Sequence, residues 1–179
     1  MKPLIASQRT RHKFATKHFQ IGIIQELTSP KNSELFFRGA QAMCELGFIV
    51  SVLAIGDQSS QEKCFELSQK YTDQFEILEA TSQNKQKVIN QSHIICFTHI
   101  PEKTTLKNIM KKSIIPMLPY GNLELTNFDA QKESGNAFLY EENNFWEFFA
   151  TLIRAFENFK FNYDWNNLKK TVKKSGDEL

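Results

Sequence analysis

The residues best suited to chemistry in this 179-residue chain are cations, hydroxyls and glycines at points where apolar runs end. Lysine binds a phosphate as a point charge, and glycine lets a ligand approach the backbone closely. Such groups follow several of the apolar runs. The candidates for nucleotide or phosphate binding are Lys31, Gly56, Asp57, Lys103, Thr104, Thr105 and Gly121.

Each candidate also has a structural explanation. Lys31 is equally well explained as a solvated lysine in a turn, and Gly56-Asp57 as the turn that ends a strand. The segment 103–105 would offer a phosphate a charge, hydroxyls and the backbone amides of a helix start. Threonine at that place also serves as a helix N-cap, which is the interpretation we favour. No catalytic residue, metal ligand set or cofactor is assigned.

The elements that must position these residues alternate along the chain. Residues 21–57 predict a strand, a helix and a second strand, and the strands of such a βαβ unit run parallel. Further helices are predicted at 59–71, 82–91, 104–112, 144–159 and from 164 onward, with strands at 75–80, 93–98, 113–118 and 137–140. This alternation predicts one doubly wound, Rossmann-like α/β domain with a mostly parallel sheet over residues 21–179. A basic arm or helix, residues 1–20, precedes it.

Local signals predict how some of these elements begin and end. Ser59 or Ser60 is expected to cap the helix at 59–71, and Asn143 or Asn144 the helix at 144–159. Asp164 is expected to cap the last helix. Pro116 indicates an edge strand or a strand end, because proline has no backbone N–H to donate to a neighbouring strand. The dense aromatic face of the helix at 144–159 predicts packing against the sheet.

Composition restricts the partners of the chain. With 22 Lys and Arg against 20 Asp and Glu, the net charge is +2, which gives no electrostatic argument for nucleic acid or a membrane as partner. The three cysteines include no CxxC pair, so they are expected to be core residues in a reducing compartment. No apolar run approaches membrane-spanning length. We therefore expect a cytoplasmic protein.

Four stretches follow one another in a recognisable order: Glu26-Leu-Thr-Ser-Pro-Lys31-Asn32, Val52-Leu-Ala-Ile-Gly56-Asp57, Gly135-Asn-Ala-Phe-Leu-Tyr140 and Asp164-Trp165. In this order the chain resembles, over roughly residues 20–175, the C-terminal nucleotide-sugar-binding domain of GT-B glycosyltransferases of the glycogen/starch synthase and group 1 type. The resemblance implies that the first two stretches match the family's Arg-Leu-x-x-x-Lys-Gly turn and Val-Leu-Gly-x-Gly-Asp strand end. It implies an ADP- or UDP-sugar as ligand.

The sequence departs from the family pattern where the donor would bind. Lys31 keeps the lysine position, but Glu26 replaces the arginine that also contacts the diphosphate, and a carboxylate repels a diphosphate. The acidic position near the donor sugar falls on Ile100, with Glu102 close by. The Gly-Gly turn becomes Tyr120-Gly121-Asn122. The resemblance also covers half of an enzyme, because GT-B catalysis takes place between two domains.

These departures leave several functions open. The first is a stand-alone, degenerate and non-catalytic module, a pseudoenzyme that binds a nucleotide sugar or a protein partner. The second is the donor-binding half of a split glycosyltransferase, similar to glycogen synthase, that needs an N-terminal GT-B domain on another chain. The third is an independent α/β protein whose crevice binds a phosphate-bearing small molecule. Acting alone, the chain is not expected to transfer sugar.

Overall fold

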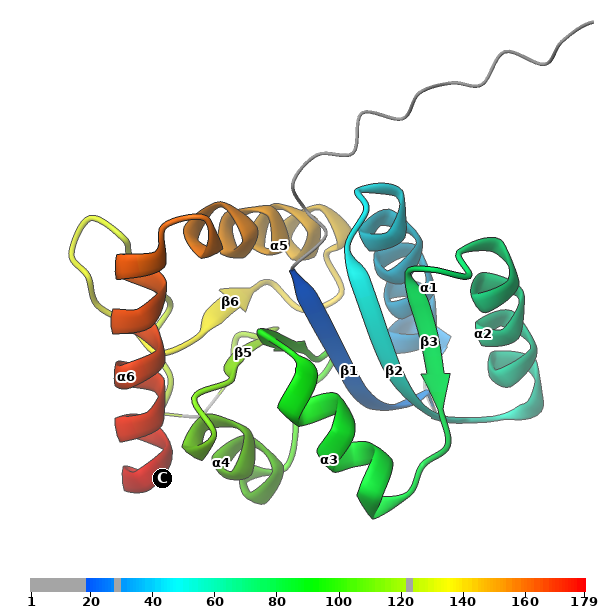
Figure 1. Cartoon of the computed structure of the whole chain (residues 1–179), viewed down its shortest axis with the longest axis horizontal. Coiled ribbons are helices and arrows are strands. Elements are labelled where there is room, and N and C mark those ends of the chain that lie inside the picture. Colours follow the sequence, from blue (N-terminus) through cyan, green and yellow to red (C-terminus); the bar gives the residue numbers. More distant parts are fainter. Residues whose placement is uncertain (1–18, 28–29, 122–123) are drawn as a thin grey trace, which may run out of the picture.

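The computed structural model describes residues 19–27, 30–121 and 124–179, with the side chains of residues 25–32 and 54–55 left outside the description (Figure 1). Residues 1–18 of the predicted basic arm also lie outside the described residues. Phe19 is completely buried, and the first strand, β1, begins at Gln20. The folded unit therefore includes Phe19 and Gln20.

The described residues form one sheet of six parallel strands, in the order β3-β2-β1-β4-β5-β6. The strands are β1 (Gln20–Leu27), β2 (Ile49–Gly56), β3 (Phe75–Leu78), β4 (Ile94–Cys96), β5 (Ile115–Pro119) and β6 (Phe138–Tyr140). The chain runs outward from β1 to β3, then returns to β4 and runs outward in the other direction. This confirms the predicted doubly wound, Rossmann-like sheet, and the order reverses between β1 and β4.

Helices cover both faces of this sheet. They are α1 (Pro30–Glu45), α2 (Gln58–Lys70), α3 (Ser82–Gln91), α4 (Lys103–Lys111), α5 (Phe145–Phe159) and α6 (Asn162–Glu178). The buried side chains of α1 and α5 join the larger hydrophobic core, and those of α3 join a second core on the other face. The last helix, α6, packs along α4.

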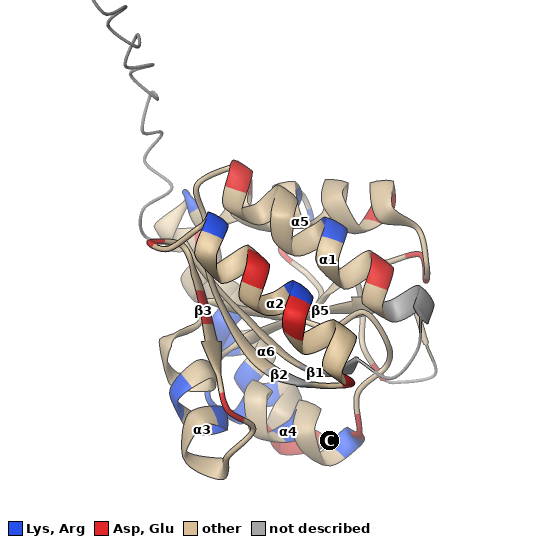
Figure 2. Cartoon of the chain, turned by 90° about the vertical axis from the view of Figure 1, so that its right-hand side faces the viewer, with Lys and Arg blue, Asp and Glu red and all other residues tan. Residues whose placement is uncertain are grey.

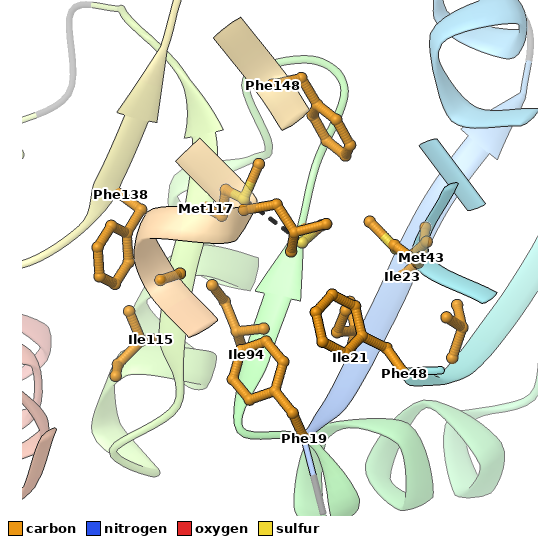
Figure 3. Close-up of a cluster of buried hydrophobic side chains, with 14 of the residues drawn as sticks. Phe19, Ile21, Ile23, Met43, Phe48, Ile94, Ile115, Met117, Phe138 and Phe148 are labelled. Atoms are coloured by element: carbon orange, nitrogen blue, oxygen red, sulfur yellow. Dashed lines mark hydrogen bonds between the residues drawn. The ribbon is translucent and has the colours of Figure 1, made fainter. Parts of the chain in front are cut away.

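The larger core is built from alternate residues of the strands and from aromatic side chains (Figure 3). Ile21 and Ile23 of β1 point into it, whereas Ile24 belongs to the second core. Phe19 packs against Phe48 and against aromatic rings of α5 and α6, with ring centroids 4.9–6.1 Å apart. The predicted role of the aromatic helix as core is thereby confirmed, although its Trp146 is 72% exposed.

Of the caps predicted for α2, α5 and α6, two are wrong and one is confirmed. Asp57, not Ser59 or Ser60, caps α2: its Oδ1 accepts a hydrogen bond of 2.8 Å from the backbone N–H of Ser60. Asp164 lies inside the first turn of α6, which begins two residues earlier. Asn144 does cap α5, where its side chain accepts from two backbone N–H groups at 3.1 and 3.2 Å.

Pro116 does not mark an edge strand, because β5 lies between β4 and β6. In the register, Pro116 is opposite Ile95 of β4, and the pairing of β5 with β6 starts only at Met117. Proline is thus tolerated in a central strand at a point where the strand is paired on one side.

Candidate functional site

The predicted site residues gather at one edge of the sheet, where the parallel strands end. Asp57 follows β2, the segment Lys103–Thr105 opens α4 after β4, and Gly121 follows β5. Lys31 lies in the first turn of α1, after β1, but its side chain is outside the described part of the chain. Since β1 separates β2 from β4, the two strands that lead to Asp57 and Lys103 are about 10 Å apart across the sheet.

The loops after β4 and β5 approach each other closely at Gly121. A Cβ atom at this position would overlap the side chain of Ile100, which is 40% exposed. A larger residue at this position would therefore require the terminal methyl group of Ile100 to turn away. The structure brings Gly121 and the start of α4 to one corner of the sheet edge.

A buried tyrosine ties the same corner to β6. The hydroxyl of Tyr140 donates to the carbonyl of Phe97, just after β4, at 2.5 Å. Burial raises the pKa of the Tyr140 phenol, so this group stays protonated and remains a donor at neutral pH. The backbone N–H of Tyr120 donates to the carbonyl of Tyr140 at 2.9 Å.

Asn127 and Arg154 are polar residues near this corner that the sequence did not single out. The Asn127 Oδ1 accepts from the Leu139 backbone N–H at 3.0 Å and from Arg154 Nη2 at 2.8 Å. Its Nδ2 donates to the Tyr120 hydroxyl at 3.2 Å. The loop between β5 and β6 folds back and brings Asn127 to its partners, which lie far from it in the sequence. No regular spacing of residues in the sequence therefore indicates these contacts.

The start of α2 is closed to an anionic ligand by Asp57. This carboxylate already occupies the N-terminus, where backbone N–H groups would otherwise face a phosphate. The hydrogen bond from the Ser60 backbone holds the pKa of Asp57 below its usual value, so the group is ionised at neutral pH. The Gly56 carbonyl likewise accepts from Gln61 Nε2 at 3.0 Å.

The start of α4 is more open. Glu102 occupies the N-cap position without a side-chain hydrogen bond to the helix, so the predicted threonine cap is wrong. Thr104 lies within the first turn, and its hydroxyl is 3.5 Å from Glu102 Oε2. Lys103 and Thr104 are exposed and Thr105 is half-buried. Backbone amides at this helix start are therefore available to a ligand.

Carboxylates dominate the described side chains at this edge. Five of them follow four of the strands, and all five are exposed: Asp57, Glu79, Glu102, Glu141 and Glu142. Lys103 stands beside Glu102 among them. Repulsion between these carboxylates and a diphosphate opposes tight binding of a nucleotide diphosphate.

Two further features adjoin the edge. The Nδ1 atom of His99, in the loop after β4, is buried without a hydrogen-bond partner among the described residues. A surface hollow of about 340 Å³ lies between α1 and α5. In it the Arg38 guanidinium lies 4.2 Å above the Phe145 ring and 3.6 Å from Glu34. Within the described ranges, no three His, Cys, Asp or Glu side chains are grouped as metal ligands would be.

At the level of sequence, the chain matches no protein-family profile and no curated protein. Solved structures do match it. The catalytic domain of starch synthase IV from Arabidopsis thaliana, bound to ADP and acarbose, superposes with a TM-score of 0.69 at 17% identity. The match covers 87% of this chain and 34% of that one, so the chain spans about a third of the starch synthase structure.

Two shorter structures match over most of their own length. The catalytic domain of cholesterol-α-glucosyltransferase from Helicobacter pylori has a TM-score of 0.64 at 15% identity, over 90% of this chain and 99% of that one. The C-terminal domain of a group 1 glycosyltransferase from Francisella tularensis has a TM-score of 0.64 at 15% identity, over 88% and 85%. These likenesses establish the fold, which is that of a GT-B glycosyltransferase domain, as the sequence motifs predicted.

Proposed function

We propose that this chain is a GT-B-like binding module that does not transfer sugar by itself. The observation that carries the proposal is the edge where the parallel strands of this GT-B-like fold end, because the described side chains there are mainly carboxylates. The fold alone does not define an activity, so the proposal depends on these residues. A catalytic acid and a diphosphate-binding arginine are not matched in the sequence.

A nucleotide sugar is the ligand that this edge fits best. The open N-terminus of α4 supplies backbone N–H groups and Lys103 supplies one charge. Gly121 leaves the adjoining loop backbone accessible, and it is exposed. Because Asp57 and Glu102 oppose the diphosphate, we expect binding with a dissociation constant in the millimolar range, near 4 kcal/mol.

The test is a titration of the ¹⁵N-labelled chain with ADP-glucose, UDP-glucose, ADP and UDP, followed by NMR. We expect saturable shifts at Thr104, Thr105 and Gly121, and weaker binding in Lys31→Ala. Glu102→Gln should bind up to about fivefold more tightly, because removal of a charge at about 4 Å in water is worth about 1 kcal/mol. Glu79→Gln, beyond the outermost strand β3, is the matched control.

Absence of saturable shifts with every nucleotide would refute nucleotide-sugar binding. Shifts that saturate at residues away from the strand ends would refute the assigned site. Release or transfer of glucose by the chain alone would refute the non-catalytic role.

A second candidate is the donor-binding half of a split glycosyltransferase. Ile100 and Tyr120 are 40% and 55% exposed at the edge where a GT-B partner domain would face this one. The chain spans about a third of the starch synthase structure, which agrees with a missing half. The test is to add a separately produced N-terminal GT-B domain from the same organism. Sugar transfer that appears with the added domain and is reduced by Ile100→Asp would support this role over the first.

A further inference from the structure

The near-neutral charge of the chain conceals a strongly basic surface on α4 and α6. Four lysines stand on α4 or just after it, and four on α6: Lys103, Lys107, Lys111, Lys112, Lys169, Lys170, Lys173 and Lys174. The helix α4 contains no acidic residue, and the three in α6 lie near its two ends. Figure 2 shows basic residues gathered on α3, α4 and α6, whereas acidic and basic residues alternate on α1 and α2.

The two helices that carry these lysines are neighbours. They are in direct contact, since a Cβ atom at Gly176 of α6 would lie 2.7 Å from the backbone nitrogen of Lys111. On α4, Lys103, Lys107 and Lys111 are four residues apart and so share one side of the helix. On α6, Lys170 and Lys174 are spaced in the same way.

Most of these ammonium groups have no acidic partner. Within the described part of the chain, one of the eight, Lys174, forms an ion pair, with Glu178 at 3.9 Å, and both side chains are mostly exposed. Lys112 instead donates to amide oxygens of α3. Elsewhere on the surface, basic groups are paired more closely, as Lys160 is with Glu157 at 2.6 Å. Unpaired like charges side by side repel one another, and an anionic partner would relieve this repulsion.

Exposed aromatic side chains stand on the same helix. Phe161 and Tyr163, at the start of α6, are 61% and 72% exposed. Tyr163 lies seven and eleven residues before Lys170 and Lys174, which places the three on one stripe along α6. A tyrosine ring has an apolar body and a polar tip, which suits the headgroup region of a bilayer, where lysines attract anionic lipids.

We propose that the α4–α6 surface docks the protein on an anionic lipid bilayer. The cations are lysines, which act as separate point charges. None of them has the planar guanidinium with which arginine makes two hydrogen bonds to one phosphate. Their spread over two helices suits a surface of laterally mobile headgroups. A single-stranded nucleic acid would favour rings placed between the cations, but the exposed rings lie at one end of α6. No helix among the described residues is long and apolar enough to span a membrane, so the contact is peripheral.

The experiment is flotation of the full chain with vesicles of phosphatidylcholine, with and without phosphatidylglycerol. We expect binding to the anionic vesicles only, weakened by added salt. Lys170→Glu/Lys174→Glu should lower the partition coefficient at least about tenfold, because each lysine near such a surface contributes about 1 kcal/mol. Lys63→Glu/Lys70→Glu on α2 changes the net charge equally and should change binding less than about twofold.

One further variant and one alternative ligand complete the test. Tyr163→Ala should weaken binding severalfold while far-ultraviolet circular dichroism stays unchanged. Equal loss in the α2 and α6 variants, or unchanged binding in the α6 variant, would overturn the proposal. Binding of homopolymeric RNA but not of vesicles, with the same lysine dependence, would also overturn it. The α6 variants leave the strand ends unchanged, so they should bind nucleotides as the parent protein does. Failure of the lipid-binding proposal can therefore be told apart from failure of the nucleotide-binding proposal.

Discussion

The hydrogen bond between Tyr140 and Phe97 allows a quantitative test of how the strand ends are held together. Tyr140→Phe removes only the hydroxyl, so packing of the ring against Phe148, 5.2 Å between centroids, is kept. The Phe97 carbonyl would lose this donor while Phe97 and Tyr140 remain almost fully buried. Removing one partner of a buried hydrogen bond costs about 1–3 kcal/mol. For a chain of this size the melting temperature should fall by about 2–4 °C per kcal/mol.

The assay is urea unfolding followed by tryptophan fluorescence, in which the midpoint should fall while the slope m is unchanged. Tyr163→Phe is the matched control, because its hydroxyl belongs to a ring that is 72% exposed. We expect this control to lie within about 0.5 kcal/mol of the parent protein. A loss in Tyr140→Phe no larger than in the control would refute the idea that this bond stabilises the link between β4 and β6.

The same residue predicts the response to alkaline pH. Burial raises the pKa of Tyr140 in the folded protein above its value in the unfolded chain. The stabilisation that this shift provides is complete below the unfolded pKa, about 10, and is lost as the pH rises from there toward the folded value. Stability should therefore fall above about pH 10, and less steeply in Tyr140→Phe. An equally steep alkaline fall in both proteins would contradict this assignment.

Three further predictions concern other described residues. Gly121→Ala should lower the free energy of unfolding by no more than about 1 kcal/mol, because the exposed side chain of Ile100 can change rotamer to make room for the added Cβ. A larger loss in urea unfolding would show that Ile100 is held in place. The hydrogen bond from the Ser60 backbone lowers the pKa of Asp57 in the folded protein. The contribution of Asp57 to folding stability is therefore present above its pKa in the unfolded chain, and it is lost as the pH falls through its pKa in the folded protein. Acid unfolding of Asp57→Ala should accordingly show a shallower pH dependence than the parent. Burial raises the pKa of all three cysteine thiols, to about 11 for Cys64, so a thiol reagent at pH 8 should react slowly until urea exposes them; fast native reaction would contradict their burial.

The alternation of strands and helices could be predicted because it depends on the local spacing of apolar residues. Apolar runs and amphipathic segments placed nearly every strand and helix, and the βαβ connections imposed parallel strands. Helix ends were harder to predict. Ser59, Ser60 and Asp57 are all good caps, and only the observed first turn shows that Asp57 takes the position. Of the two interpretations of Pro116, the edge strand is wrong, because β6 pairs with β5 from the next residue onward. The strand end agrees with its place as the second residue of β5.

The sequence by itself determined the class of fold and the edge of the sheet at which to look, because both depend on residue order and period. It also supplied the motifs that resemble GT-B glycosyltransferases, and the matching structures agree. The tertiary structure alone decided which groups meet. The contact of Gly121 with Ile100 and the bonds of Asn127 join residues from separate loops. The basic α4–α6 surface is invisible in a net charge of +2, because charge balance is a sum and only folding determines where each charge lies.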